Sequence, residues 1–330
     1  MSKALDPILK ISNLQTHFFT KAGVLKAVDG VSFEIGAGEI VGLVGESGSG
    51  KSITGFSIIG LVDAPGKIVG GDISFKGQNL NQLSNEQMQH YRGNRIAMIF
   101  QDPMMTLNPV LRIETQMIEA IQAHDDSIAH EDARIRARDA LGLVGISSAD
   151  ERLRAYPHQF SGGMRQRVSI AIAMLNRPDL IIADEPTTAL DVTIQGQVIS
   201  EMQKLCQETK TALLWITHDL AVVSGIADRI CVMYAGRVVE QGSIESTILN
   251  PMHPYTRGLM GSVPSQNQRG KPLQQIDGMV PSMLNLPNGC AFQNRCRRVN
   301  DTCLTKQPDI MHLADGRQVR CINLPEEYKV

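Results

Sequence analysis

One eight-residue segment combines glycines, a lysine and a serine in a pattern typical of phosphate binding. Gly45-Glu46-Ser47-Gly48-Ser49-Gly50-Lys51-Ser52 fits G-x-x-x-x-G-K-[ST]. An apolar segment predicted to be a strand, Ile40–Val44, precedes it, and an apolar helical segment follows from Ile53. Glycines let the backbone curl so that successive N–H groups face phosphate oxygens, and the following helix adds its positive N-terminal end. The residues expected to form this cradle are Gly45, Ser47, Gly48, Ser49, Gly50, Lys51 and Ser52.

Two side chains of the cradle have expected roles of their own. Lys51 is placed to reach the β- and γ-phosphates of a nucleotide, and Ser52 to offer its hydroxyl to Mg²⁺.

A second segment supplies the acidic groups that such a site needs. Leu180-Ile181-Ile182-Ala183-Asp184-Glu185 reads as a buried strand that ends in two carboxylates. Parallel strands commonly present functional groups at this end. We expect Asp184 to hold Mg²⁺ through its water shell, and Glu185 to orient and deprotonate an attacking water.

The surrounding pattern indicates an α/β fold. Residues 8–100 predict strands, the stretch from about Asp102 to Arg167 is helical, and strands then alternate with helices such as Val192–Glu208. This alternation favours a parallel sheet flanked by helices. The predicted strands are Ile8–Leu14, Val31–Ile35, Ile40–Val44, Gly71–Phe75, Ile96–Phe100, Leu180–Ala183, Ala212–Thr217 and Ile230–Tyr234; the clearest amphipathic helix is Ser127–Val144.

Composition narrows the class of protein. The chain has 330 residues, of which 42% are hydrophobic and 20% charged, as in ordinary globular proteins of roughly two domains. A net charge of −2 argues against a dedicated nucleic-acid binder. Apolar runs such as Ser52–Val62 fall short of the ~20 residues of a membrane span, and Met1–Asp6 has no signal-peptide character. We therefore expect a cytoplasmic protein that meets a membrane only through a partner.

The six cysteines divide into two groups. Cys206 and Cys231 lie singly in apolar segments and are expected to be buried. Four others fall within the last 41 residues, with spacings C-x5-C, C-x6-C and C-x17-C. Clustered cysteines in a reducing compartment favour a metal over disulfides, and 4Fe–4S, zinc and no metal all stay open from the residues alone. The four are Cys290, Cys296, Cys303 and Cys321, and Arg295, Arg297 and Arg298 are expected to offset their anionic charge.

A third segment identifies the family that the chain resembles. Phe160-Ser161-Gly162-Gly163-Met164 stands between the two nucleotide motifs, with Ser161 placed 23 residues before Asp184. Together with Gln101, Asp191 and His218, it makes residues 8–250 resemble the nucleotide-binding subunit of an ABC transporter. The resemblance implies an ABC-type P-loop ATPase core, a mixed sheet flanked by helices, over residues 1–250. A helical subdomain is then inserted at about 102–167, and 251–330 form a loop-rich extension.

The resemblance also implies roles for individual residues. Ser161, Gly162 and Gly163 match the signature loop, which binds the γ-phosphate of ATP held by the opposite subunit; the family usually has Leu and Gln where this chain has Phe160 and Met164. Gln101 matches the glutamine that senses Mg²⁺ and the lytic water. Ala189–Asp191 matches a loop crossing the dimer interface, and His218, 33 residues after Glu185, matches the switch histidine at the γ-phosphate.

Two further positions follow from the same family. An aromatic residue near the first strand stacks on adenine; Phe18 aligns best, and Phe19 is the alternative. Residues 102–109, with Met104 and Met105, match the surface that receives short helices of the membrane subunits, although a plain surface loop is the other interpretation.

The C-terminal part narrows the resemblance to the dipeptide/oligopeptide and nickel importers. His253-Pro254-Tyr255-Thr256 resembles a motif of these importers, and the cysteine tail resembles the extension of one of their ATPase subunits. The implied function is ATP hydrolysis that powers import of short peptides, with nickel or another small solute as the alternative. The implied partners are a paired homologous ATPase, two membrane permease subunits and a substrate-binding receptor, at the cytoplasmic face of the inner membrane.

The resemblance favours a 4Fe–4S cluster over zinc at the cysteines. The tail is too Pro-rich and aperiodic to fold around a core of its own, so we expect loss of any one cysteine ligand to disorder it while leaving nucleotide binding by residues 8–250 largely unaffected. A non-transport ATPase of the superfamily would carry fused halves or long coiled-coil insertions, which this sequence lacks. A degenerate binding module is disfavoured by intact Lys51, Asp184, Glu185 and His218.

Overall fold

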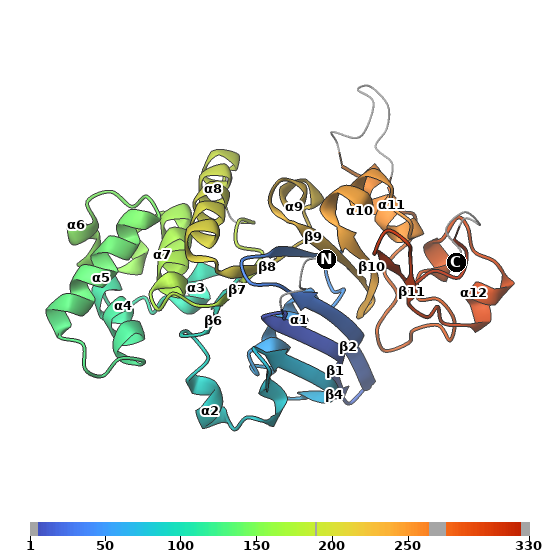
Figure 1. The fold of residues 1–330 in the computed structure, drawn as a ribbon, viewed down its shortest axis with the longest axis horizontal. Coiled ribbons are helices and arrows are strands. Elements are labelled where there is room, and N and C mark those ends of the chain that lie inside the picture. Colours follow the sequence, from blue (N-terminus) through green and yellow to red (C-terminus); the bar gives the residue numbers. More distant parts are fainter. Residues whose placement is uncertain (1–5, 189, 264–274, 325–330) are drawn as a thin grey trace. The chain divides into compact units, whose positions relative to one another are not determined.

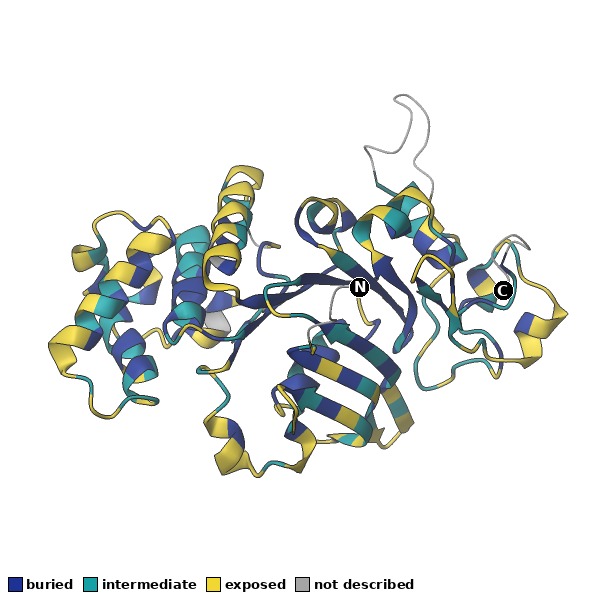
Figure 2. Ribbon diagram, in the orientation of Figure 1, coloured by how far each residue is buried: buried dark blue, intermediate teal, exposed yellow. Residues whose placement is uncertain are grey.

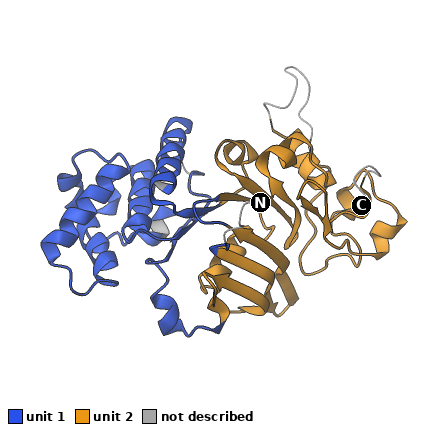
Figure 3. Ribbon diagram, in the orientation of Figure 1, with its two compact units in different colours: residues 1–8, 36–39, 82–214 blue, residues 9–35, 40–81, 215–330 orange. Residues whose placement is uncertain are grey.

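The computed structural model describes residues 6–188, 190–263 and 275–324 (Figure 1). The chain divides into two compact units, coloured separately in Figure 3. Unit 1 comprises residues 1–8, 36–39 and 82–214, and unit 2 comprises residues 9–35, 40–81 and 215–330. Within the described ranges, no helix has both the length and the apolar character needed to cross a bilayer.

Unit 1 joins parallel strands to a group of helices. Strand β6 pairs in parallel with β7, from Ile96 opposite Leu180 to Ile99 opposite Ala183, so both strands end at the same edge. Helices α3 to α7 come between them in the chain, and α5 packs against α4, α6 and α7. The elements are α2 (Asn85–Gln89), β6 (Ile96–Ile99), α3 (Pro103–Thr106), α4 (Ile113–Gln122), α5 (His130–Leu143), α6 (Ala149–Leu153), α7 (Gly162–Met174), β7 (Leu180–Asp184) and α8 (Val192–Thr209).

Unit 2 is built on two sheets. One is antiparallel with the strand order β2-β1-β4-β5; the other runs β11-β12-β10-β9-β3, in which β3 pairs in parallel with β9. Strand β8 (Ala212–Thr217) carries the chain from unit 1 into unit 2. The remaining elements are β1 (Leu9–Thr20), β2 (Gly23–Ile35), β3 (Ile40–Val44), α1 (Lys51–Ile58), β4 (Gly66–Phe75), β5 (Gln78–Asn79), α9 (Leu220–Ile226), β9 (Arg229–Tyr234), β10 (Arg237–Ser243), α10 (Ile244–Leu249), α11 (Pro254–Gly261), α12 (Asp301–Thr305), β11 (Met311–His312) and β12 (Gln318–Val319).

Apolar strands form the centre of each unit. Strands β3, β7 and β8 are buried at every residue, which is why they lack polar alternation in the sequence (Figure 2). In the helical part, Ile113, Met117 and Ile121 repeat every four residues along one fully buried face of α4. The predicted α/β architecture is confirmed.

Within unit 2, the C-terminal segment adds a strand to the sheet that contains β10. Strand β12 pairs with β10, with Glu240 opposite Val319. A small cluster of buried residues forms there, so the expectation that the tail has no core of its own is wrong. The pairing supplies the backbone order that an aperiodic sequence does not predict. The cluster comprises Met252, Leu313, Val319, Cys321 and Leu324.

The turn between β3 and α1 depends on glycines. Gly48 and Gly50 have φ values of +77° and +102°, which L-residues rarely adopt. A Cβ at Gly50 would overlap the carbonyl oxygen of Ala27 and lie 2.8 Å from Cε of Met233, whereas one at Gly48 would enter open space. Glycine is therefore required at position 48 by the backbone conformation alone, and at position 50 by close packing as well.

This difference yields a prediction about stability. Gly48→Ala should cost about 1–2 kcal/mol, because only the positive φ is strained. Gly50→Ala should cost a further ~1–3 kcal/mol, because the added methyl collides with backbone. Urea denaturation of both variants, followed by circular dichroism, measures the two losses. Equal losses would show that the contact of Gly50 with Ala27 is not what requires glycine.

Candidate functional site

The cradle predicted in the sequence is a loop that folds around the ammonium of Lys51. Lys51 is 4% exposed, and its Nζ donates to the carbonyl oxygens of Gly45 at 2.9 Å and Glu46 at 3.0 Å. Ser49 donates its backbone N–H to the carbonyl of Glu46 at 3.2 Å, which tightens the turn. Ser52 follows Lys51 in the first turn of α1. The loop thus holds a buried cation beside the start of a helix, an arrangement suited to an anionic ligand.

Residues of the His-Pro-Tyr motif complete this loop, a contact that sequence reasoning missed. The backbone N–H of Glu46 donates to Oη of Tyr255 at 2.8 Å, across 209 residues of chain. His253 begins α11 as its N-cap and accepts the Tyr255 N–H on Nδ1 at 3.0 Å. Burial lowers the pKa of His253 to about 3, so the ring is neutral and can accept this bond. The motif therefore fixes a tyrosine hydroxyl against the loop.

In unit 1, two predicted catalytic residues lie together although 84 positions separate them. Nε2 of Gln101 donates to Oε2 of Glu185 at 3.3 Å, and Oγ1 of Thr188 donates to the same oxygen at 3.0 Å. They meet because the parallel strands β6 and β7 end at one edge. Asp184, at the end of β7, is 3% exposed. Glu185 has φ of +45°, an uncommon conformation that often marks functional positions.

The other residues implied by the resemblance occupy helix starts. Ser161 is the N-cap of α7 and accepts the Met164 N–H at 3.3 Å, so Gly162 and Gly163 form the first turn. Asp191 caps α8 by accepting the Ile194 N–H at 3.0 Å, while Ala189 lies outside the described residues. His218 follows β8 directly and precedes Asp219, the N-cap of α9.

The predicted adenine contact has two candidate rings on β1. Phe18 is half-buried and pairs with Gly66 of β4, while Phe19 is 48% exposed. Successive side chains of a strand point to opposite faces, so only one ring can face a given ligand. The segment expected to contact the membrane subunits, residues 102–109, contains helix α3. The side chains of Met104 and Met105 lie outside the described part of the chain.

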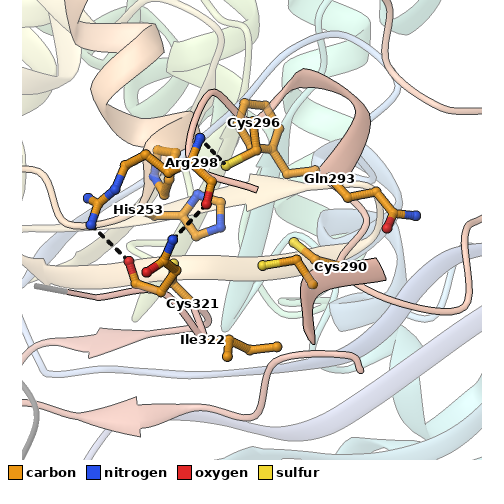
Figure 4. A pocket seen from close by; sticks show the side chains of 11 residues that line it. His253, Cys290, Gln293, Cys296, Arg298, Cys321 and Ile322 are labelled. Carbon is orange, nitrogen blue, oxygen red and sulfur yellow. Dashed lines mark hydrogen bonds between the residues drawn. The ribbon is translucent and has the colours of Figure 1, made fainter. Parts of the chain in front are cut away.

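The four C-terminal cysteines line one cavity of unit 2, shown in Figure 4. The cavity encloses about 350 Å³ including its open mouth. Cys303 and Cys321 are buried, and Cys290 and Cys296 are partly buried. Burial raises the pKa of the Cys321 thiol to about 11 and also raises those of Cys290 and Cys296, and each is raised further by other thiols of the group. The cysteines predicted to act together are therefore brought together.

The described residues contain no group of three His, Cys, Asp or Glu side chains arranged to hold a single metal ion. Of the three nearby arginines, only Arg298 lines the cavity. Arg297 is exposed and pairs with Asp277, and Arg295 pairs with Glu46, so the expectation that all three offset thiolate charge is wrong. Cys206 and Cys231 are buried elsewhere, as predicted.

Comparison with known proteins agrees with this arrangement. Residues 28–188 match the ABC transporter family, and residues 239–303 match the oligopeptide/dipeptide transporter C-terminal region. The oligopeptide transport ATP-binding protein AppD of Bacillus subtilis is 49% identical over 98% of both chains. The dipeptide transport ATP-binding protein DppD of Escherichia coli is 45% identical over 95% of this chain and 96% of its own.

A solved structure matches the fold at greater sequence distance. The dimeric, post-hydrolysis ATP-binding cassette MJ0796 bound to ADP and Pi is 28% identical, with a TM-score of 0.65. It covers 72% of this chain and 98% of its own. The chain therefore belongs to the ATP-binding proteins of the ABC transporter family, in the group that carries the oligopeptide/dipeptide C-terminal region.

Proposed function

We propose that this chain is the ATP-hydrolysing subunit that powers import of short peptides through a membrane ABC transporter. The observation that carries the proposal is near full-length similarity to ATP-binding proteins of oligopeptide and dipeptide transport, including the C-terminal region. Those names favour peptides over the nickel alternative. We place the chain at the cytoplasmic face of the inner membrane as a peripheral subunit, because its relatives are the ATP-binding proteins of peptide transport systems.

Phosphate binding is the first task that we assign. Backbone N–H groups of the loop face the phosphates. The Lys51 ammonium, which two loop carbonyls hold in the structure, moves to the phosphate oxygens when the nucleotide binds. The hydroxyl of Ser52, the carboxylate of Asp184 and the amide oxygen of Gln101 are the hard oxygen donors that Mg²⁺ takes. Bound Mg²⁺ would neutralise charge on the β- and γ-phosphates. The loop residues are Gly45, Ser47, Gly48, Ser49, Gly50, Lys51 and Ser52, and Phe18 stacks on adenine.

Hydrolysis is the second task. Glu185 takes the proton of the attacking water, and Gln101, already bonded to its Oε2, orients the carboxylate and that water. His218 contacts the γ-phosphate. The support is the Gln101–Glu185–Thr188 arrangement, in which both side chains donate to Oε2 and hold the Glu185 carboxylate at the end of β7.

A second ATPase subunit completes the site in this proposal. In-line displacement needs charge stabilisation on the far side of the γ-phosphate. The first-turn N–H groups of α7 at Ser161, Gly162 and Gly163 would serve the partner's ATP, and Asp191 lies on the loop that crosses the interface. A paired homologous ATPase, two permease subunits and a substrate receptor are the partners that we propose.

For the cysteine cavity we propose a 4Fe–4S cluster held by Cys290, Cys296, Cys303 and Cys321. All four cysteines line one cavity, yet among the described residues no three His, Cys, Asp or Glu side chains converge as one tetrahedral ion requires, with every Zn–S distance at ~2.3 Å. A cluster suits wider spacing, because each thiolate binds a different iron atom. Such a cluster would supply structural order here.

The first test concerns Glu185. Glu185→Gln should lower steady-state ATPase of the assembled complex by ~10²-fold or more, because it removes the base. ATP binding should persist, since an amide oxygen still accepts from Gln101 and Thr188. Glu201→Gln, at an exposed position of α8, is the matched control and should retain wild-type turnover. A variant keeping more than about a tenth of the activity would refute the role of Glu185.

The second test concerns the shared site. The isolated, monomeric chain should hydrolyse ATP poorly, because its Ser161 loop serves another subunit. Adding the paired ATPase and the membrane subunits should raise turnover. Phosphate release measured alongside light scattering gives activity and oligomeric state together. Full activity in a preparation shown to be monomeric would contradict the two-subunit site.

The third test concerns metal content. Anaerobically purified protein should contain roughly four irons per chain and absorb broadly in the visible range. Replacing any of the four cavity cysteines by Ser should remove the iron, while Cys206→Ala should keep it, because Cys206 is buried outside the cavity. One zinc per chain, or no metal in folded anaerobic protein, would overturn the cluster.

A further inference from the structure

A buried arginine of the C-terminal extension binds the phosphate loop. The side chain of Arg295 is 4% exposed, and its Nη1 and Nη2 lie 2.7 Å and 3.0 Å from Oε2 and Oε1 of Glu46. This is a two-point guanidinium–carboxylate pair, the geometry that fixes orientation as well as charge. Glu46 belongs to the loop Gly45–Ser52, and 249 residues separate the partners in sequence. Nothing in the nucleotide motif itself predicts the contact.

The guanidinium of Arg295 also has contacts outside the loop, which fix its position. Its Nε donates to the carbonyl of Asp277 at 3.0 Å, and its Cζ lies 5.9 Å from the ring centres of both Tyr234 and Phe292. The bond to Glu46 raises the pKa of Arg295 above its usual value, so the cation is permanent. A planar, stacked guanidinium loses little freedom on pairing. Arg295 is therefore a rigid anchor.

Glu46, held by Arg295, in turn holds Lys51, the lysine that we assign to the phosphates. Glu46 is fixed at three points: its carboxylate by Arg295, its N–H by Oη of Tyr255, and its carbonyl by Nζ of Lys51 at 3.0 Å. Two of these three partners belong to the C-terminal region. If Glu46 becomes more mobile, its carbonyl oxygen, which positions the Lys51 ammonium, therefore becomes more mobile as well.

We propose that Arg295, assisted by Tyr255, is a positioning residue for the phosphate loop, so that the C-terminal extension sets the affinity of this chain for the triphosphate of ATP. The inference rests on the proposed role of the Gly45–Ser52 loop in binding ATP. Arg295 ends the short helical turn Gln293–Arg295 and directly precedes Cys296 of the cysteine cavity. In this proposal, order at the cavity is passed to the loop, so disordering the tail weakens nucleotide binding instead of leaving it largely unaffected.

Charge gives the pair a second effect on ATP. Glu46 is 31% exposed, so without Arg295 it would present an uncompensated carboxylate beside the bound phosphates. Arg295→Met should therefore weaken ATP binding through both lost order and repulsion. Adding Glu46→Gln to that variant removes the repulsion and should restore part of the affinity. A contact that only stabilises the fold would not show this restoration.

The experiment measures equilibrium binding of the fluorescent nucleotide mant-ATP to the full chain, purified anaerobically. Arg295→Met should raise Kd about 10-fold, within the usual range for coupled sites. The double variant Arg295→Met/Glu46→Gln should recover about half of that loss on a logarithmic scale. Arg297→Met is the matched control: it changes an exposed arginine two positions away and should leave Kd unchanged. In the assembled transporter, Arg295→Met should raise KM for ATP more than it lowers kcat.

Further variants separate the possible failures. If Arg295→Met does not fold, Tyr255→Phe removes only the hydroxyl that accepts the Glu46 N–H and should raise Kd about 3-fold. Folded Arg295→Met, or folded Tyr255→Phe in its place, with wild-type Kd would overturn the inference. Wild-type protein that does not bind mant-ATP, or a Lys51→Ala variant that binds it normally, would instead refute the proposed function of the loop.

Discussion

A buried ammonium must be surrounded by oxygen atoms, and in unit 2 this requirement organises the phosphate loop. Lys51 is almost wholly buried and is held by the carbonyls of Gly45 and Glu46. Removing such a charge from water costs several kcal/mol unless partners replace the solvent. The carbonyls must therefore be fixed. Ser49 binds the Glu46 carbonyl from within the loop, and Tyr255 and Arg295 hold the N–H and the carboxylate of Glu46 from outside it. Phosphate oxygens would compete for the same ammonium, so rigidity of the loop bears directly on how readily the lysine can exchange partners.

Unit 1 meets a different constraint, the placement of a carboxylate at a strand end. Glu185 takes a positive φ that costs about 1–3 kcal/mol, and the cost is tolerated where neighbouring bonds determine the conformation. Gln101 and Thr188 provide those bonds to Oε2. Because β6 and β7 are parallel, Gln101 after β6 and Glu185 after β7 lie at the same edge of the sheet. Both units thus use short contacts between sequence-distant segments to hold one charged group.

Local pattern predicts the centre of this fold well and its periphery poorly. Ile40–Val44 is a strand as predicted. The helix predicted over Val192–Glu208 ends one residue later, at Thr209, and Asp191 caps its start. The first strand runs to Thr20 rather than Leu14, because its polar half is stabilised by pairing with β2 and β4 on both sides. The nucleotide motifs are local and were found. Tyr255 and Arg295 were not assigned to the loop, because a contact across more than 200 residues leaves no local pattern.

The cysteine cavity joins this network through proton and nucleotide linkage. Burial raises the pKa values of the thiols of Cys290, Cys296 and Cys321, so the cluster that we propose would have to displace their protons on binding. The same segment carries Arg295 to Glu46. Coupling between sites is reciprocal: if an ordered extension strengthens ATP binding by some factor, bound ATP strengthens the ordered extension by the same factor. The His-Pro-Tyr motif and the cysteine tail look separate from the Gly45–Ser52 loop in the sequence, yet Tyr255 and Arg295 bring both into contact with it at Glu46.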